Sequence, residues 1–322
     1  MTTGSLDDFG RIAIAVAILY IPVLITSIFL VCRHGFKRDA GWIFLVIFSV
    51  IRIGGGGSMV AAELIRPINK TLYEVALIME SMGLQPLLMT TLGFLRTMYV
   101  KPFSLVAQLT NATLFSSGAG SFGENPMATQ MWRILGILST VALGLTVYGG
   151  TNSTSTNPDT LKESNNYRHI GSLLFLALYL LLLGVHLLAW MKSSTLMRNR
   201  RTLLKAISCA LPFLGVRCLY GILNSYSGSL INTDDAPNTS SLARFNMVTG
   251  SWEIYLVMSV LMEACACLIY VVAGTQVPLS QDFIAKTSDY GMYGGGNSGS
   301  PYGQSPYAPQ TPYNKYVAPY RA

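Results

Sequence analysis

Seven long apolar runs constrain this chain more than any other feature of its sequence. A helix rises 1.5 Å per residue, so about 20 apolar residues are needed to cross a hydrocarbon core about 30 Å thick. Only 11% of the residues are charged, whereas an ordinary soluble domain carries about 25%. The sequence therefore predicts an all-α polytopic membrane protein, a bundle of seven transmembrane helices, and argues against a cytosolic enzyme or a secreted disulfide scaffold. The predicted spans are Ile12–Cys32, Gly41–Leu64, Thr71–Leu95, Trp132–Tyr148, Ile170–Met191, Leu203–Leu223 and Trp252–Ala273.

The distribution of basic residues predicts how the helices are oriented, because cytoplasmic loops of membrane proteins carry an excess of Lys and Arg. With the N-terminus outside, eleven basic residues fall in inner loops and six in outer segments, not counting the C-terminal tail. The outer six are Arg11, Arg66, Lys70, Lys162, Arg168 and Arg244. We therefore expect an outer N-terminus and a cytosolic C-terminus. The net charge of +7 then reflects orientation and contact with anionic membrane lipid, and no nucleic-acid partner is expected.

The long loop after the third span contains a further apolar segment. Residues 102–115 are apolar enough to lie on the membrane as an amphipathic helix. An eighth span there would move the basic cluster from Arg198 to Lys205 to the outside. The sequence therefore favours seven spans.

Three segments are expected: a short outer N-terminus (1–11), the seven-helix domain (12–276) and a cytosolic tail (277–322). The tail is rich in Gly, Pro, Ser and Tyr, with four near-repeats that begin at Ser300, Ser305, Thr311 and Ala318. Such a segment buries too little apolar surface to offset its chain entropy, so we expect it to be disordered. It either docks cytosolic proteins through its Ser-Pro and Thr-Pro sites or is a low-complexity terminus without a function.

Glycosylation sequons agree in part with this topology. Asn152 and Asn238 fall on the predicted outer side and are candidate glycosylation sites. Asn69 lies too close to the membrane and Asn111 falls inside, so both are expected to remain unglycosylated. The expected location is the endoplasmic reticulum or the plasma membrane.

All five cysteines lie in predicted spans or at their ends, so no external disulfide is expected. On a helix, the side chains of Cys265 and Cys267 point about 200° apart, which does not suit a metal site. The sequence predicts buried thiols, no bound metal and no cofactor.

Four ionisable residues lie deep inside the predicted spans. Such a group is costly at the bilayer centre unless it is paired or hydrated, which makes it a functional candidate. Counted along their helices, Arg52, Glu80, Arg217 and Glu263 all lie near the membrane midplane. We expect two ion pairs, Arg52–Glu80 and Arg217–Glu263, and treat these residues as candidate catalytic groups. The alternative is that the charges only fix the order of the helices.

Further polar residues are candidates for a cavity around this set. The candidate substrate-binding residues are Glu63, Gln85, His186, Tyr220 and Asn224. His186 lies near the inner end of an aliphatic span and also suits a hydrogen-bonded structural role. Residues 54–57 are four glycines, which permit close helix approach or a kink.

The expected topology is that of seven-helix receptors, but the signatures of the rhodopsin-like receptors are missing. The third span ends Leu95-Arg96-Thr97-Met98-Tyr99 without their acidic–arginine–tyrosine triplet, and the seventh lacks their Asn-Pro-x-x-Tyr motif. The seventh span also has no lysine, which excludes retinal bound as a Schiff base. The sequence contains no P-loop and no GxSxG motif, so ATPase and serine-hydrolase chemistry are unsupported.

Two short stretches carry a resemblance to a known family. They are Arg52-Ile-Gly-Gly, and Glu80-Ser-Met-Gly-Leu-Gln-Pro-Leu-Leu followed by Leu92-Gly-Phe-Leu-Arg96. These residues resemble those of a family of fungal seven-helix integral membrane proteins, some of which are encoded near natural-product genes. The resemblance covers the membrane domain and not the tail. It implies a fungal source and a role in secondary metabolism, and it supplies no active site.

Three functions are open at this point. The first is a membrane-embedded enzyme that opens a ring in, or cyclises, a lipophilic small molecule; Glu80 or Glu263, kept protonated, would be the acid. Arg52 or Arg217 would orient that acid or stabilise negative charge. A paired arginine favours the ionised carboxylate, so the acid role requires one unpaired carboxylate. The second function is a receptor or sensor whose tail recruits cytosolic proteins, and the third is a transporter of small molecules or lipids, for which no internal repeat is evident.

Overall fold

The structure is a computed structural model of the chain, and it describes residues 8–34, 41–65, 70–110, 126–152, 157–191, 198–227, 242–247 and 250–276. These residues are helical apart from short connections and contain no β-strand. The helices are α1 (Asp8–His34), α2 (Trp42–Leu64), α3 (Lys70–Met82), α4 (Leu84–Thr110), α5 (Pro126–Thr151), α6 (Pro158–Met191), α7 (Arg198–Tyr226), η3 (Ala243–Phe245), α8 (Trp252–Tyr255), η4 (Leu256–Leu261) and α9 (Met262–Gln276). The predicted tail and Asn238 lie outside the described residues.

Seven segments of the described chain are helical, long enough and apolar enough to cross a membrane, as the sequence predicts. The third segment consists of α3 and α4, which are separated at Gly83, and the seventh consists of α8, η4 and α9. Helix α4 continues to Thr110. Residues 102–110 therefore extend this helix and do not form a separate surface helix, while residues 111–115 lie outside the described part.

The outward faces of the helices carry large aliphatic side chains. Ile18, Ile25, Ile137 and Leu187 are each more than half exposed. A surface of this kind on helices of this length suits a lipid environment, where every backbone polar group is satisfied within the helix. The helices therefore form an integral multi-pass membrane protein.

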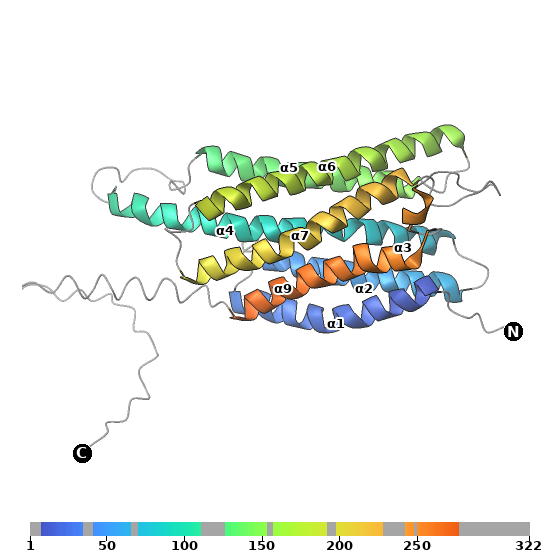
Figure 1. Cartoon of the computed structure of the whole chain (residues 1–322), viewed down its shortest axis with the longest axis horizontal. Helices are drawn as coiled ribbons and strands as arrows, with labels where there is room; N and C mark the ends of the chain where they lie inside the picture. The colour runs from blue at the N-terminus through green and yellow to red at the C-terminus, as the bar shows by residue number, and fades with distance from the viewer. Residues whose placement is uncertain are drawn as a thin grey trace, which may run out of the picture. The chain divides into compact units, whose positions relative to one another are not determined.

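The helices lie side by side in a bundle, with α5 and α6 at one edge and α1 at the opposite edge (Figure 1). Glycines allow close approach between neighbours. A Cβ atom on Gly56 of α2 would stand 2.8 Å from the carbonyl oxygen of Ala13 in α1. Helix α2 nevertheless remains one continuous helix, so the four-glycine run serves close packing.

Aromatic packing joins α2, α4 and α9 near the end of the bundle at which α1 ends. The ring of Phe94 lies 4.4 Å from that of Trp42 and 5.3 Å from that of Tyr270, measured between centroids. The hydroxyl of Tyr270 is 2.6 Å from that of Thr91. On α2 and α9, the buried charges Arg52 and Glu263 lie farther toward the opposite end of the bundle.

Candidate functional site

The four buried charges expected from the sequence meet in one ionic network, made of Arg52 (α2), Glu80 (α3), Arg217 (α7) and Glu263 (α9). All four lie about 9–12 residues, roughly 14–18 Å, from the end of the bundle at which α1 begins. Arg52 forms ion pairs with both Glu80 and Glu263. Arg217 donates through Nε to Oε1 of Glu263 at 2.5 Å and lies 4.0 Å from Glu80. The two expected pairs are confirmed, and the Arg52–Glu263 pair joins them.

The network is electrically neutral and almost closed to solvent. The side chains of Glu263, Arg52 and Arg217 are 1%, 3% and 5% exposed, whereas that of Glu80 is 12% exposed. Two cations balance two anions, which is how charges persist in an apolar interior. Glu263, held by both arginines, is the centre of the network, and Glu80 is its most accessible member.

The break between α3 and α4 shapes the network. A Cβ atom on Gly83 would stand 2.6 Å from Nη2 of Arg52, so any larger residue here would have to displace this guanidinium. In a continuous helix the carbonyl oxygen of Glu80 would accept a hydrogen bond from the fourth residue onward. Because α3 ends at Met82, this oxygen instead accepts hydrogen bonds from Gly83 N and from Nη2 of Arg217, each at 3.4 Å.

The seventh span approaches the network through a π-helix, η4. Such segments are rare and occur frequently at functional sites. The hydroxyl of Ser259, within η4, donates a hydrogen bond to Oε1 of Glu80 at 3.2 Å. Glu263 follows one turn later, so the seventh span contacts both arginines and the carboxylate of α3.

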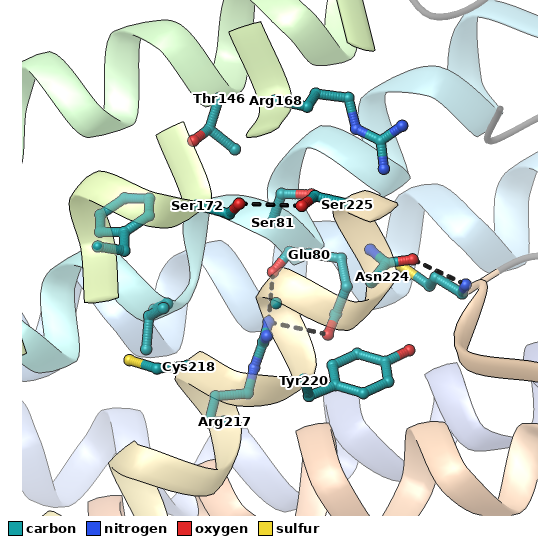
Figure 2. Close-up of a pocket in the computed structure, with 14 residues that line it drawn as sticks. Glu80, Ser81, Thr146, Arg168, Ser172, Arg217, Cys218, Tyr220, Asn224 and Ser225 are labelled. Carbon is teal, nitrogen blue, oxygen red and sulfur yellow. Dashed lines mark hydrogen bonds and ion pairs between the residues drawn. The ribbon is translucent and has the colours of Figure 1, made fainter. Parts of the chain in front are cut away.

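A cavity of about 50 Å³, called the polar cavity after the charged and polar residues in its wall, lies beside the network (Figure 2). It is lined by residues of α3, α4, α5, α6 and α7, and by Met247 between α7 and α8. Its polar lining residues are Glu80, Ser81, Thr146, Arg168, Ser172, Arg217, Tyr220, Asn224 and Ser225. Glu80 and Arg217 thus belong to both the network and the cavity wall. The volume suffices for a few water molecules or one small polar molecule.

A second, mostly apolar cavity of about 30 Å³ also has Glu80 in its wall. Its lining comes from α1, α2, α3 and the start of the seventh span, and includes Phe9, Val16, Met59, Leu77 and Tyr255. Glu80 is the one carboxylate that lines both of these cavities.

Two of the residues expected to bind substrate line the polar cavity. The ring of Tyr220 lies 5.6 Å from Cζ of Arg217, within reach of a cation–π contact. Asn224 accepts a hydrogen bond through Oδ1 from the backbone N of Met247 at 3.0 Å, which leaves its amide NH2 for the cavity. Both residues lie on α7, after Arg217.

The other three candidates, Glu63, Gln85 and His186, line neither cavity. Glu63 packs against Gly10 of α1, where a Cβ atom would collide with its carboxylate. His186 is hydrogen-bonded to Ser208 at 2.9 Å, and Trp190 Nε1 donates to its ring at 3.1 Å. Ser208 lies about 13 Å from Arg217 along α7. These contacts support the structural alternative for His186.

Arg168, which the topology assigns to an outer segment, is buried in the cavity wall. The apolar pattern does not place it in a span, because the fifth span is expected to begin at Ile170, whereas α6 begins at Pro158. A sequence signal for this start exists, since Pro158-Asp159 places a proline and an acidic residue in a first helical turn. Gly83 and Ser259 were also missed, and their roles depend on neighbours from other helices.

No group of three or more His, Cys, Asp or Glu residues in the described chain is placed to hold a metal ion. The five cysteines are free thiols, but the prediction that they are buried is wrong for Cys32 and Cys209, which lie on the outer faces of their helices. No curated protein and no solved structure matches the chain. A family model described as a domain of unknown function, DUF7702, matches residues 6–279, a range that includes every helix of the bundle. The chain therefore belongs to the DUF7702 family.

Proposed function

We propose that this protein is a membrane-embedded receptor or sensor that binds a small polar ligand in the cavity beside the ionic network. The observation that carries the proposal is that Glu80 and Arg217 line the cavity and also join helices through the network. A ligand that bonds to either residue competes with interhelical contacts, so its affinity depends on how α3, α7 and α9 are arranged. A ligand shifts a conformational equilibrium through such a difference in affinity.

The pairing of the carboxylates argues against acid catalysis on a lipophilic substrate. Glu80 and Glu263 are both ion-paired to arginine, so neither meets the requirement for an unpaired carboxylate. Pockets for drug-sized ligands usually measure about 300–1,000 Å³, and the polar cavity measures about 50 Å³. These features favour a small polar ligand.

The proposed receptor has its N-terminus outside and its tail in the cytosol, in the endoplasmic reticulum or the plasma membrane. The cavity then lies toward the outer side, because the connection that contains Met247 is an outer one. The tail would bind cytosolic proteins.

A second candidate is an enzyme of fungal secondary metabolism, and the position of Glu80 favours it. Glu80 lines a polar and an apolar cavity, so it can face both the polar group and the apolar chain of one substrate. Paired with Arg52, it would act as a general base and not as an acid. A substrate of this kind requires the two cavities to join.

Hydrogen–deuterium exchange on the protein in nanodiscs tests the receptor. Exchange is measured after adding either the polar or the lipid-soluble fraction of an extract from cells that carry the gene. We expect the polar fraction to slow exchange in residues 80–85 and 217–225 of the wild type, and not in Glu80→Gln. Glu253→Gln, which changes an exposed carboxylate on the seventh span, should respond as the wild type does. A response to the lipid-soluble fraction alone, or to neither fraction, would overturn the proposal.

A comparison of cells with and without the gene separates the two candidates. If the protein is a receptor, cells without the gene should differ in their transcript levels but should accumulate no precursor. An accumulated, unrearranged precursor, restored to product by the wild type and not by Glu80→Gln, would establish the enzyme.

A further inference from the structure

We infer that the ligand of the polar cavity is a small monovalent carboxylate held by Arg168. This inference rests on the proposed function, since it names the chemical class of ligand that the same cavity binds.

Arg168 is a buried cation without an anionic partner in the described chain. It is 6% exposed, and its hydrogen bond to a protein atom goes to the neutral Oδ1 of Asn165 at 3.4 Å. Arg52 and Arg217, by contrast, are both paired with carboxylates. An unpaired charge is costly in an apolar interior. A fold that retains one against a cavity is therefore expected to receive its counter-ion from a ligand.

The packing of α5 against α6 directs this side chain. A Cβ atom on Gly149 of α5 would stand 2.6 Å from Cγ of Arg168, so glycine is required where the stem of the arginine passes. Figure 2 shows the guanidinium of Arg168 across the cavity from Arg217. The position is built by two helices and is not the result of a loose surface side chain.

The surrounding groups suit a carboxylate. The guanidinium presents parallel N–H donors that match two carboxylate oxygens, and the amide NH2 of Asn224 is a further donor. The hydroxyls of Ser172 and Ser225 lie 2.9 Å apart and each also donates to a backbone carbonyl of its own helix, so they add polarity to the wall but no free donor.

Charge sets the valence of the ligand. The ionic network is neutral, so Arg168 gives the cavity a net charge of one positive unit. One carboxylate balances this charge, whereas a phosphate dianion would leave excess negative charge beside Glu80.

Thermal unfolding of the full chain in nanodiscs tests the inference, because a ligand that binds only the folded state raises Tm with its concentration. The probes are sodium acetate, its neutral analogue acetamide, sodium chloride and sodium phosphate, at equal ionic strength. We expect acetate alone to raise Tm, and Arg168→Gln to abolish the shift. Arg133→Gln, which alters an exposed arginine on α5, should keep the full shift. Arg168→Lys keeps the positive charge but loses the parallel N–H donors of the guanidinium, so acetate should raise its Tm by a smaller amount.

An equal shift with acetamide, chloride or phosphate, no shift with acetate, or a full shift in Arg168→Gln would overturn the inference. If Arg168→Gln does not fold, Gly149→Ala tests the same site by displacing the arginine stem, and its shift should be reduced. If the polar extract slows hydrogen–deuterium exchange but acetate does not raise Tm, the proposed function is supported and this inference is overturned.

Discussion

Gly83 and Arg52 occupy adjoining space, since a Cβ atom on Gly83 would stand 2.6 Å from Nη2 of the guanidinium. The break between α3 and α4 therefore makes room for the cation that joins the two carboxylates. The position of the Arg52 guanidinium thus depends on the absence of a side chain at Gly83, where the helix is interrupted.

Gly83→Ala should displace Arg52 and lower the free energy of unfolding by about 1–3 kcal/mol, the usual cost of overpacking. Gly57→Ala is the matched control, because no atom lies within 4 Å of the Cβ position of Gly57. It should be neutral or stabilising by up to about 1 kcal/mol, since alanine is the better helix former. Denaturant titration in mixed micelles measures both variants. Equal losses in the two would contradict the assigned role of Gly83.

Glu263→Gln should cost more than any other single change in the network. It leaves two arginines with one carboxylate, and an uncompensated buried charge costs about 3–5 kcal/mol. Glu253→Gln, on the exposed face of the same span, should change stability by less than about 0.5 kcal/mol. Thermal unfolding in nanodiscs compares the two. A Glu263→Gln variant as stable as the wild type would show that the pairing contributes little.

His186→Ala separates structural from binding residues. It removes the ring that bonds to Ser208 and Trp190, which keep their own hydrogen bond at 2.8 Å, so the expected cost is about 0.5–1.5 kcal/mol. The exchange response to the polar extract should be unchanged, because His186 does not line the cavity. Asn224→Ala should weaken that response. Loss of the response in His186→Ala would place this histidine in the binding site after all.

Glycan mapping tests the expected orientation. If the N-terminus is outside, Asn152→Gln and Asn238→Gln should each remove one glycan, seen as a change in gel mobility that treatment with a glycosidase abolishes. Asn111→Gln should have no effect. A glycan lost only with Asn111 would invert the topology and place the polar cavity toward the cytosol.

The sequence predicts the spans well because their signal is local. About 20 apolar residues per crossing is a requirement of the bilayer, and it can be read without knowing any contact. The depth of Arg52, Glu80, Arg217 and Glu263 follows in the same way from the rise per residue. The depth of Arg168 cannot be obtained in this way, because α6 begins at Pro158 and the apolar run begins later.

The contacts between helices carry no comparable signal. Hydropathy alone does not distinguish a network from two separate pairs, and it does not show that Gly83 accommodates Arg52 or that Ser259 donates to Glu80. It also does not show that His186 and Glu63 face neighbours away from the cavity.

Position along each helix axis is thus decided by the order of residues, since each residue advances the helix by the same distance. Which charges pair, whether Arg168 meets a carboxylate of the described chain and where a cavity forms are decided by the rotation of each helix about its axis and by its choice of neighbours. Side-chain packing across the whole bundle sets both, and no single segment of the chain contains that information.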